Sequence, residues 1–241
     1  MVKNNDMEMK FKEVYFINLI DEKEQKYRLI LSTGKYDNSI QKFRSSLSKD
    51  EIEILNNFKV ISRQNEFITG RILAKNNVLL IKEKIKPTDI NIISGVWGFP
   101  IFDTNGINKM WVSIAHSSEY AASLLSEAGT HPIGVDIEEI NPNNEVTLAF
   151  FLSKYKKSFT LEEKHIYWAA KEAVSKALRT GFTISETFFE ISEITLHNSI
   201  YTIAFKHLPR LNALAWIKNN VVISIAYPIE LKFDSIKNMN L

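Results

Sequence analysis

Residues 162–180 form the most regular amphipathic stretch of this 241-residue chain. Most of its apolar side chains are small, which affects how closely another element can pack against it. One apolar stripe at helical spacing contains Ile166, Ala170, Ala173, Val174 and Ala177. Alanines in such a stripe allow another element to approach the helix closely. The pattern therefore predicts a long helix packed tightly against a second element. The helix is predicted to end at Gly181, because glycine commonly caps helices.

Most of the remaining sequence predicts short strands, since it contains short runs of β-branched and aromatic residues. The predicted strands are 13–20, 27–32, 78–81, 111–115, 120–125, 133–137, 193–196, 201–205, 213–217 and 221–227. Two further helices are predicted, one beginning at the capping box formed by Ser48 and Glu51 and one over 63–75. Strands and helices do not alternate regularly, so the pattern predicts an α+β fold rather than a doubly wound sheet.

The predicted elements divide the chain into two halves. Each half has several short strands and one long helix, and the turn at 126–132 separates them. We therefore expect an N-terminal half over 1–128 and a C-terminal half over 129–241. Each half is expected to contain a small, mainly antiparallel sheet.

Composition limits the kinds of metal site, partner and location that this chain can have. The chain has no cysteine, which rules out disulfides and thiolate metal sites. Any bound metal must be held by Asp, Glu or His side chains or by backbone oxygens, which favours a hard cation. A net charge of +2 does not indicate nucleic-acid binding. No apolar run has the length of a membrane span and residues 1–12 are polar, so a cytoplasmic protein is expected.

Two carboxylates lie two residues apart in the predicted strand Gly134-Val135-Asp136-Ile137-Glu138. Alternation along a strand places Asp136 and Glu138 on one side, while Val135 and Ile137 point into the core. Two carboxylates this close repel each other unless a cation or a proton lies between them, so they suit Mg²⁺. The alternative interpretation is a half-exposed strand with a polar outer face.

Glu172 and Lys176 lie four residues apart in the predicted helix 162–180, so they are neighbours on one face. They share the side opposite the apolar stripe with Trp168 and Arg179. This side is either an ordinary salt-bridged surface or part of a site. The indole of Trp168 favours the second interpretation, because indoles are seldom left in water.

A third segment, 111–117, is strand-like and ends in His116-Ser117. A single histidine is usually structural. At a strand end with hydroxyl groups beside it, it can instead donate a hydrogen bond to a phosphate.

The order and spacing of these three segments resemble the signature of the 4′-phosphopantetheinyl transferase superfamily. That signature joins a Ser-His-Ser strand end, a Gly-Val/Ile-Asp-Ile-Glu strand and a Trp-x-x-Lys-Glu-Ala/Ser-x-x-Lys helix; here these are His116-Ser117, Gly134–Glu138 and Trp168–Lys176. Upstream, residues 47–71 and the chain length resemble the surfactin-type class, which joins two similar α+β halves in one polypeptide.

The resemblance implies an enzyme that transfers phosphopantetheine from coenzyme A to a serine of an apo acyl or peptidyl carrier protein, releasing 3′,5′-ADP. Mg²⁺ is implied as cofactor, with Asp136, Glu138 and Glu172 as ligands. Glu172 is also implied as the general base and Lys176 as a catalytic residue that contacts the pyrophosphate. His116, Ser113, Lys176 and Arg71 are the implied coenzyme A contacts. A monomer is expected.

Two positions depart from the family pattern. The Gly-Lys-Pro loop of the family is Gly98-Phe99-Pro100 here, which removes a lysine near the coenzyme A phosphates. Ala115 stands where serine usually precedes the histidine. These departures leave open a family member that binds coenzyme A or a carrier protein without transfer. A second alternative is an unrelated metal-dependent phosphohydrolase that uses the same acidic residues. The aromatic and lysine-rich segment 150–157 is expected to help bind an acidic carrier.

Overall fold

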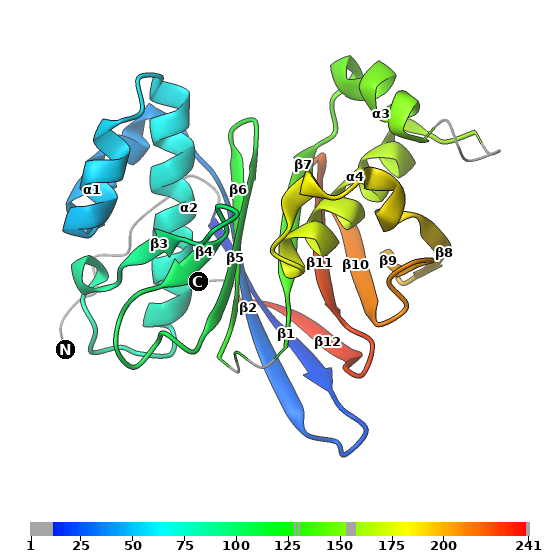
Figure 1. Cartoon of the computed structure of the whole chain (residues 1–241), viewed down its shortest axis with the longest axis horizontal. Helices are drawn as coiled ribbons and strands as arrows, with labels where there is room; N and C mark the ends of the chain where they lie inside the picture. Colours follow the sequence, from blue (N-terminus) through cyan, green and yellow to red (C-terminus); the bar gives the residue numbers. More distant parts are fainter. Residues whose placement is uncertain (1–11, 128, 130, 153–157, 240–241) are drawn as a thin grey trace.

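The computed structural model describes residues 12–127, 129, 131–152 and 158–239. Its first sheet is antiparallel and has the strand order β12-β1-β2-β6-β5 (Figure 1). The five strands are β1 (Lys12–Ile20), β2 (Lys26–Lys35), β5 (Trp111–Ser117), β6 (Tyr120–Ser126) and β12 (Lys232–Met239). A small hairpin of β3 (Ile92–Ser94) and β4 (Pro100–Phe102) lies between β2 and β5 in sequence.

The second sheet is also antiparallel, in the order β7-β11-β10-β9-β8. It contains β7 (Gly134–Glu139), β8 (Ile191–His197), β9 (Ile200–Phe205), β10 (Leu211–Lys218) and β11 (Val221–Pro228). One edge strand of each sheet carries a predicted motif: β5 ends in His116-Ser117, and β7 contains Asp136 and Glu138.

Four α-helices accompany the sheets: α1 (Lys49–Asn56), α2 (Ile61–Leu79), α3 (Glu145–Leu152) and α4 (Leu161–Ala177). Figure 1 shows α1 and α2 on one side of the molecule and α3 and α4 on the other. None of the helices in the described ranges is long and apolar enough to cross a membrane. The lysine-rich part of the expected carrier-binding segment, 153–157, lies outside the described residues.

The two sheets pack face to face through one apolar core. Tyr15, Leu31 and Leu124 of the first sheet join Val135 and Ile225 of the second in this core. On the outer faces, α2 covers the first sheet and the small residues of α4 cover the second. The chain thus forms layers of helix, sheet, sheet and helix, with burial of apolar area as the main driving force.

The predicted α+β class with antiparallel sheets and a long helix is confirmed. The division at 128/129 remains a prediction. The C-terminal strand β12 pairs with β1, so the first sheet is completed by residues from the end of the chain. Sequence patterns did not predict β12, because Lys232–Met239 mixes charged and apolar residues without strong β propensity.

Two local predictions are wrong. Residues 78–81 are not a strand, because α2 continues to Leu79 and buries Val78. Gly181 does not cap α4, which ends at Ala177 with Leu178 as its C-cap. Arg179 instead adopts the left-handed conformation at φ 59°, where glycine is usually found. Its guanidinium lies 3.6 Å from the ring centre of Trp111 and 4.6 Å from that of Phe99, so the stacking offsets the backbone strain.

An ion cluster is buried between α1 and α2. The Oε2 atom of Glu51 accepts the Ser48 N–H of the predicted capping box and lies 2.6 Å from Lys75 Nζ. Lys75 Nζ also donates to the carbonyls of Ser46 and Pro87. The side chains of Glu51 and Lys75 are both 0% exposed. The attraction between the two charges offsets the cost of removing them from water only when both are present.

Removing one charge of this cluster should be costly. We expect Lys75→Met to lower the free energy of unfolding by about 3–5 kcal/mol, because Glu51 would remain buried with only Arg71, 3.6 Å away, as a cationic neighbour. The double variant Glu51→Gln/Lys75→Met should recover part of the loss. Urea titration followed by circular dichroism measures both, with Lys35→Met at the exposed Lys35–Glu119 pair as a control. A cost below about 1 kcal/mol for Lys75→Met would contradict this account.

Candidate active site

Strand β7 presents alternate residues to the core and to α4. Val135 and Ile137 are buried in the core between the sheets, as the alternation predicts. The other face carries Gly134, Asp136 and Glu138. Asp136 is only 2% exposed, so its carboxylate faces protein rather than bulk water.

Gly134 lets α4 approach β7 closely. A Cβ atom at this position would lie 2.0 Å from the Ala173 carbonyl oxygen and 2.5 Å from the Ala177 nitrogen. Both are backbone atoms, so no side-chain rotation relieves the overlap. The tight packing predicted from the alanines of α4 is thus observed, and it brings the polar residues of the helix toward those of the strand.

Gly134→Ala should therefore damage the site by separating α4 from β7. We expect the melting temperature to fall and any activity of the site to drop more than stability alone explains, because the carboxylates of β7 would lose their contacts with the helix. Thermal unfolding and activity measured well below the melting temperature test this. Gly106→Ala is the matched control for thermal unfolding, since its φ of 85° strains an alanine but nothing lies within 4 Å of its Cβ. Equal effects of the two variants would refute the role of close approach.

Four polar side chains of β7 and α4 come together. Lys176 Nζ lies 2.5 Å from Asp136 Oδ1 and 3.9 Å from Glu172 Oε2. The second oxygen of Asp136, Oδ2, is buried and has no hydrogen-bond partner within the described ranges. Glu138 follows Asp136 on the same face. The structure therefore brings together the four predicted residues Asp136, Glu138, Glu172 and Lys176.

The acidic residues of this group perturb one another. Burial raises the pKa of Glu138 to about 8, and the neighbouring Asp136 carboxylate adds to the shift. Burial also raises the pKa of Asp136 and of Glu172, although Lys176 opposes both shifts. Burial disfavours the charged form of Lys176, yet the surrounding carboxylates raise its pKa overall. One ammonium thus faces three carboxylates, an arrangement that a further cation would stabilise.

Strand β5 adds residues from the first sheet. The Ser117 hydroxyl donates to Glu138 Oε2 at 2.8 Å. Ser113 is buried, and its hydroxyl accepts a hydrogen bond from the Val135 backbone N–H at 3.0 Å. These two serines join the edge strands β5 and β7, which have no backbone ladder between them. The observed contact of Ser113 is therefore structural, and its predicted contact with coenzyme A remains a prediction.

His116 and Arg71 lie in different surroundings. His116 is partly exposed at the end of β5, with Nδ1 3.7 Å from Glu66 Oε2 of α2. It is close enough to the β7–α4 group to interact electrostatically with Asp136 and Lys176. Arg71 is instead buried beside Glu51, 3.6 Å away, and over the ring of Phe67. The structure thus places His116 with the site and Arg71 with the α1–α2 ion cluster.

Some residues near the site were not found from the sequence. Glu66 and Arg63 lie on α2, about 50 positions before His116, and no local pattern links them to it. The stacking of Arg179 on Phe99 and Trp111 was also missed. The replacement of the expected lysine by Phe99 was the one available signal, because an aromatic residue there can stack on a cation.

The carboxylates remain compatible with a divalent metal even though Lys176 lies against one of them. The described residues contain no preassembled group of three His, Asp or Glu side chains around one point. Lys176 lies against Asp136 Oδ1, while Asp136 Oδ2 is buried and unsatisfied. A buried carboxylate oxygen without a donor is an expected position for a metal contact. Asp136, Glu138 and Glu172 supply the hard oxygen ligands that Mg²⁺ prefers.

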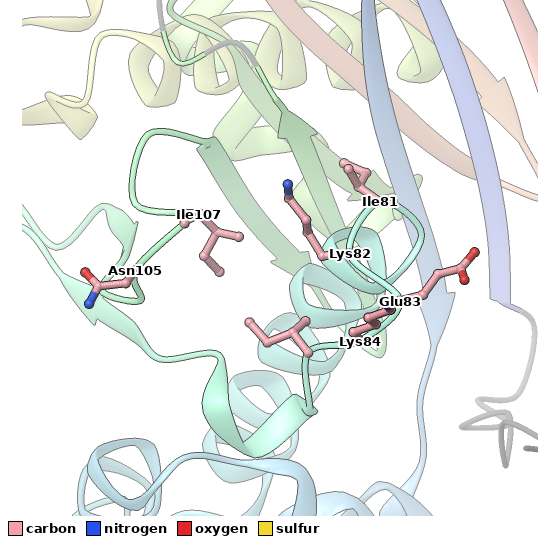
Figure 2. A pocket seen from close by; sticks show the side chains of 8 residues that line it. Ile81, Lys82, Glu83, Lys84, Asn105 and Ile107 are labelled. Carbon is pink, nitrogen blue, oxygen red and sulfur yellow. The ribbon is translucent and has the colours of Figure 1, made fainter.

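A separate surface pocket of about 600 Å³ lies beyond the C-terminal end of α2. Figure 2 shows Ile81, Lys82, Glu83 and Lys84 on one side and Asn105 and Ile107 on the other. None of the predicted site residues lines it. Volume alone therefore does not locate the site, which is defined by converging charged groups.

Carboxylates, a lysine and a histidine thus lie together where the edge strands β5 and β7 meet, and such clusters of perturbed ionisable groups are typical of functional sites. Residues 132–226, which include all of β7 and α4, match the model of the 4′-phosphopantetheinyl transferase superfamily. In this segment, which carries β7 and α4, the chain is similar to that superfamily. No curated protein matches the sequence.

Proposed function

We propose that the protein transfers the 4′-phosphopantetheine group of coenzyme A to a serine of an apo acyl or peptidyl carrier protein and releases 3′,5′-ADP. The observation that carries the proposal is the convergence of Asp136 and Glu138 with Glu172 and Lys176, inside the segment that matches the superfamily. We further propose the surfactin-type class, with both halves in one monomeric chain.

The transfer requires a serine hydroxyl to attack the β-phosphorus of coenzyme A. A new P–O bond forms to the serine oxygen, the bond to the bridging pyrophosphate oxygen breaks, and 3′,5′-ADP leaves. Glu172 accepts the serine proton, directly or through water. Its pKa is raised by burial, which makes its carboxylate a stronger base than an exposed glutamate. Such base catalysis contributes about 10²–10⁴-fold.

Charge on the pyrophosphate is the second obstacle. When bound, Mg²⁺ neutralises negative charge on phosphate oxygens. Asp136, Glu138 and Glu172 are the residues that would hold it. Lys176 is held near them by the carboxylates and can pair with a pyrophosphate oxygen as an additional positive charge. His116, at the end of β5, is proposed to contact the 3′-phosphate of coenzyme A.

One experiment tests the function. The protein is incubated with coenzyme A, Mg²⁺ and an apo carrier protein, and the carrier is measured by intact-mass spectrometry. We expect the carrier to gain one phosphopantetheine group in a Mg²⁺-dependent reaction. Consumption of coenzyme A in the absence of a carrier would indicate a phosphohydrolase instead. Binding of either partner without any reaction would indicate a protein that has lost transfer.

A further inference from the structure

Glu66 lies beside one ring nitrogen of His116, the residue proposed to contact the 3′-phosphate. Its Oε2 atom is 3.7 Å from His116 Nδ1, and the side chain is only 17% exposed. Arg63 Nη1 donates to the same oxygen at 2.7 Å and so orients the carboxylate. The exposed Arg63 lies on the first turn of α2, and Glu66 lies three residues further along the helix. The imidazole thus already has an anionic neighbour on the side of α2.

A phosphate at His116 would meet two opposing effects of Glu66. The carboxylate favours the cationic form of the imidazole, opposing the loss caused by partial burial. It also repels a phosphate that carries up to two negative charges. Once bound, the phosphate itself stabilises the imidazolium, so the first effect becomes redundant while the repulsion remains. Arg63 offsets part of this repulsion, but it is exposed and acts on His116 more weakly than Glu66 does, so a net repulsion remains in the bound state.

We propose that Glu66 is a specificity-determining residue that reduces the contribution of the 3′-phosphate, so that the enzyme accepts dephospho-coenzyme A almost as well as coenzyme A. This inference rests on the proposed function, because it concerns which form of the donor substrate is used. The substrate feature that Glu66 discriminates against is the ribose 3′-phosphate. Arg63 acts as a positioning residue by holding the Glu66 carboxylate toward His116.

Binding of two nucleotides tests the inference without any transfer. Calorimetry compares 3′,5′-ADP, which carries the 3′-phosphate, with 5′-AMP, which lacks it. We expect Glu66→Gln to bind 3′,5′-ADP about tenfold more tightly than the parent, with less than about a twofold change for 5′-AMP. The gain should shrink at high salt, because repulsion at a partly exposed site is screened. An unchanged or weakened affinity for 3′,5′-ADP would overturn the proposal.

Two controls isolate the contact. Glu83→Gln removes the same charge from the exposed turn after α2, visible in Figure 2, and should change neither affinity. In a His116→Ala background, Glu66→Gln should change 3′,5′-ADP binding by less than about twofold, since the phosphate is no longer held beside Glu66. A full tenfold gain in that background would show that Glu66 acts elsewhere and would overturn the assignment.

Transfer kinetics then separate this inference from the proposed function. The parent should show kcat/KM values for coenzyme A and dephospho-coenzyme A within about threefold, and Glu66→Gln should shift the ratio about tenfold toward coenzyme A. Transfer with an unshifted ratio would refute the role of Glu66 while leaving the function intact. Absence of transfer from either donor would refute the function, whereas the nucleotide affinities would still decide the role of Glu66.

Discussion

Asp136→Asn should lower kcat/KM for phosphopantetheine transfer by about 10³-fold while leaving the protein folded. The substitution keeps the shape of the side chain but removes an anionic oxygen that is buried and without a donor. Loss of metal-assisted charge neutralisation costs several kcal/mol, and about 4 kcal/mol corresponds to 10³-fold in rate. The initial rate of carrier modification, measured over a range of Mg²⁺ concentrations, gives the result.

Metal binding can be followed separately from the rate. Added Mg²⁺ with 3′,5′-ADP should raise the melting temperature of the parent, because a ligand that binds the native state stabilises it. Asp136→Asn should show little of this increase. Glu139→Gln is the matched control, since it lies on the same strand but alternation directs it to the other side of β7. Near-parental rates of Asp136→Asn at limiting Mg²⁺ would refute the metal assignment.

Glu172→Gln should reduce kcat by about 10³-fold, because it removes both the proton acceptor and one proposed metal ligand. Affinity for coenzyme A should change far less, since Lys176 and His116 remain in place. Rapid-quench measurement of the chemical step and calorimetry with coenzyme A distinguish the two effects. Glu162→Gln, in the exposed first turn of the same helix, should retain parental activity.

Lys176→Ala provides the opposite pattern. It should mainly raise KM for coenzyme A, because the ammonium is proposed to contact the pyrophosphate. The parental KM should rise with ionic strength in the same direction. If Glu172→Gln instead raised KM and Lys176→Ala instead abolished turnover at saturating coenzyme A, the two roles would have to be exchanged.

Local sequence patterns predicted much of the fold and of the candidate site. The spacing of Asp136 and Glu138 followed from strand alternation, and that of Glu172 and Lys176 from the helical repeat. The alanines of α4 predicted a close partner, because small residues in a buried stripe are useful only where another backbone approaches. These properties depend on residues a few positions apart, and such short-range relations can be recognised along a chain.

The ends of the helices were predicted less well from the sequence. The helix cap was assigned to Gly181 because glycine tolerates positive φ, but Arg179 adopts that conformation through its stacking on two distant rings. Likewise, Val78 has high β propensity but is buried in the last turn of α2. In both cases contacts with residues far along the chain outweighed a local preference of about 1 kcal/mol.

Only the tertiary structure decided which residues share the site. The sequence alone determined the α+β class, the paired carboxylates of the strand and the shared helix face of Glu172 and Lys176, since each depends on a local pattern. Packing placed Ser113 against the backbone of β7, Arg71 in a buried ion cluster and Glu66 beside His116. The physical reason is that electrostatic interactions depend on distance in space and on burial. The number of residues between two positions specifies neither their distance in space nor their burial. The partners of His116 are therefore known only when α2, β5 and β7 are packed together.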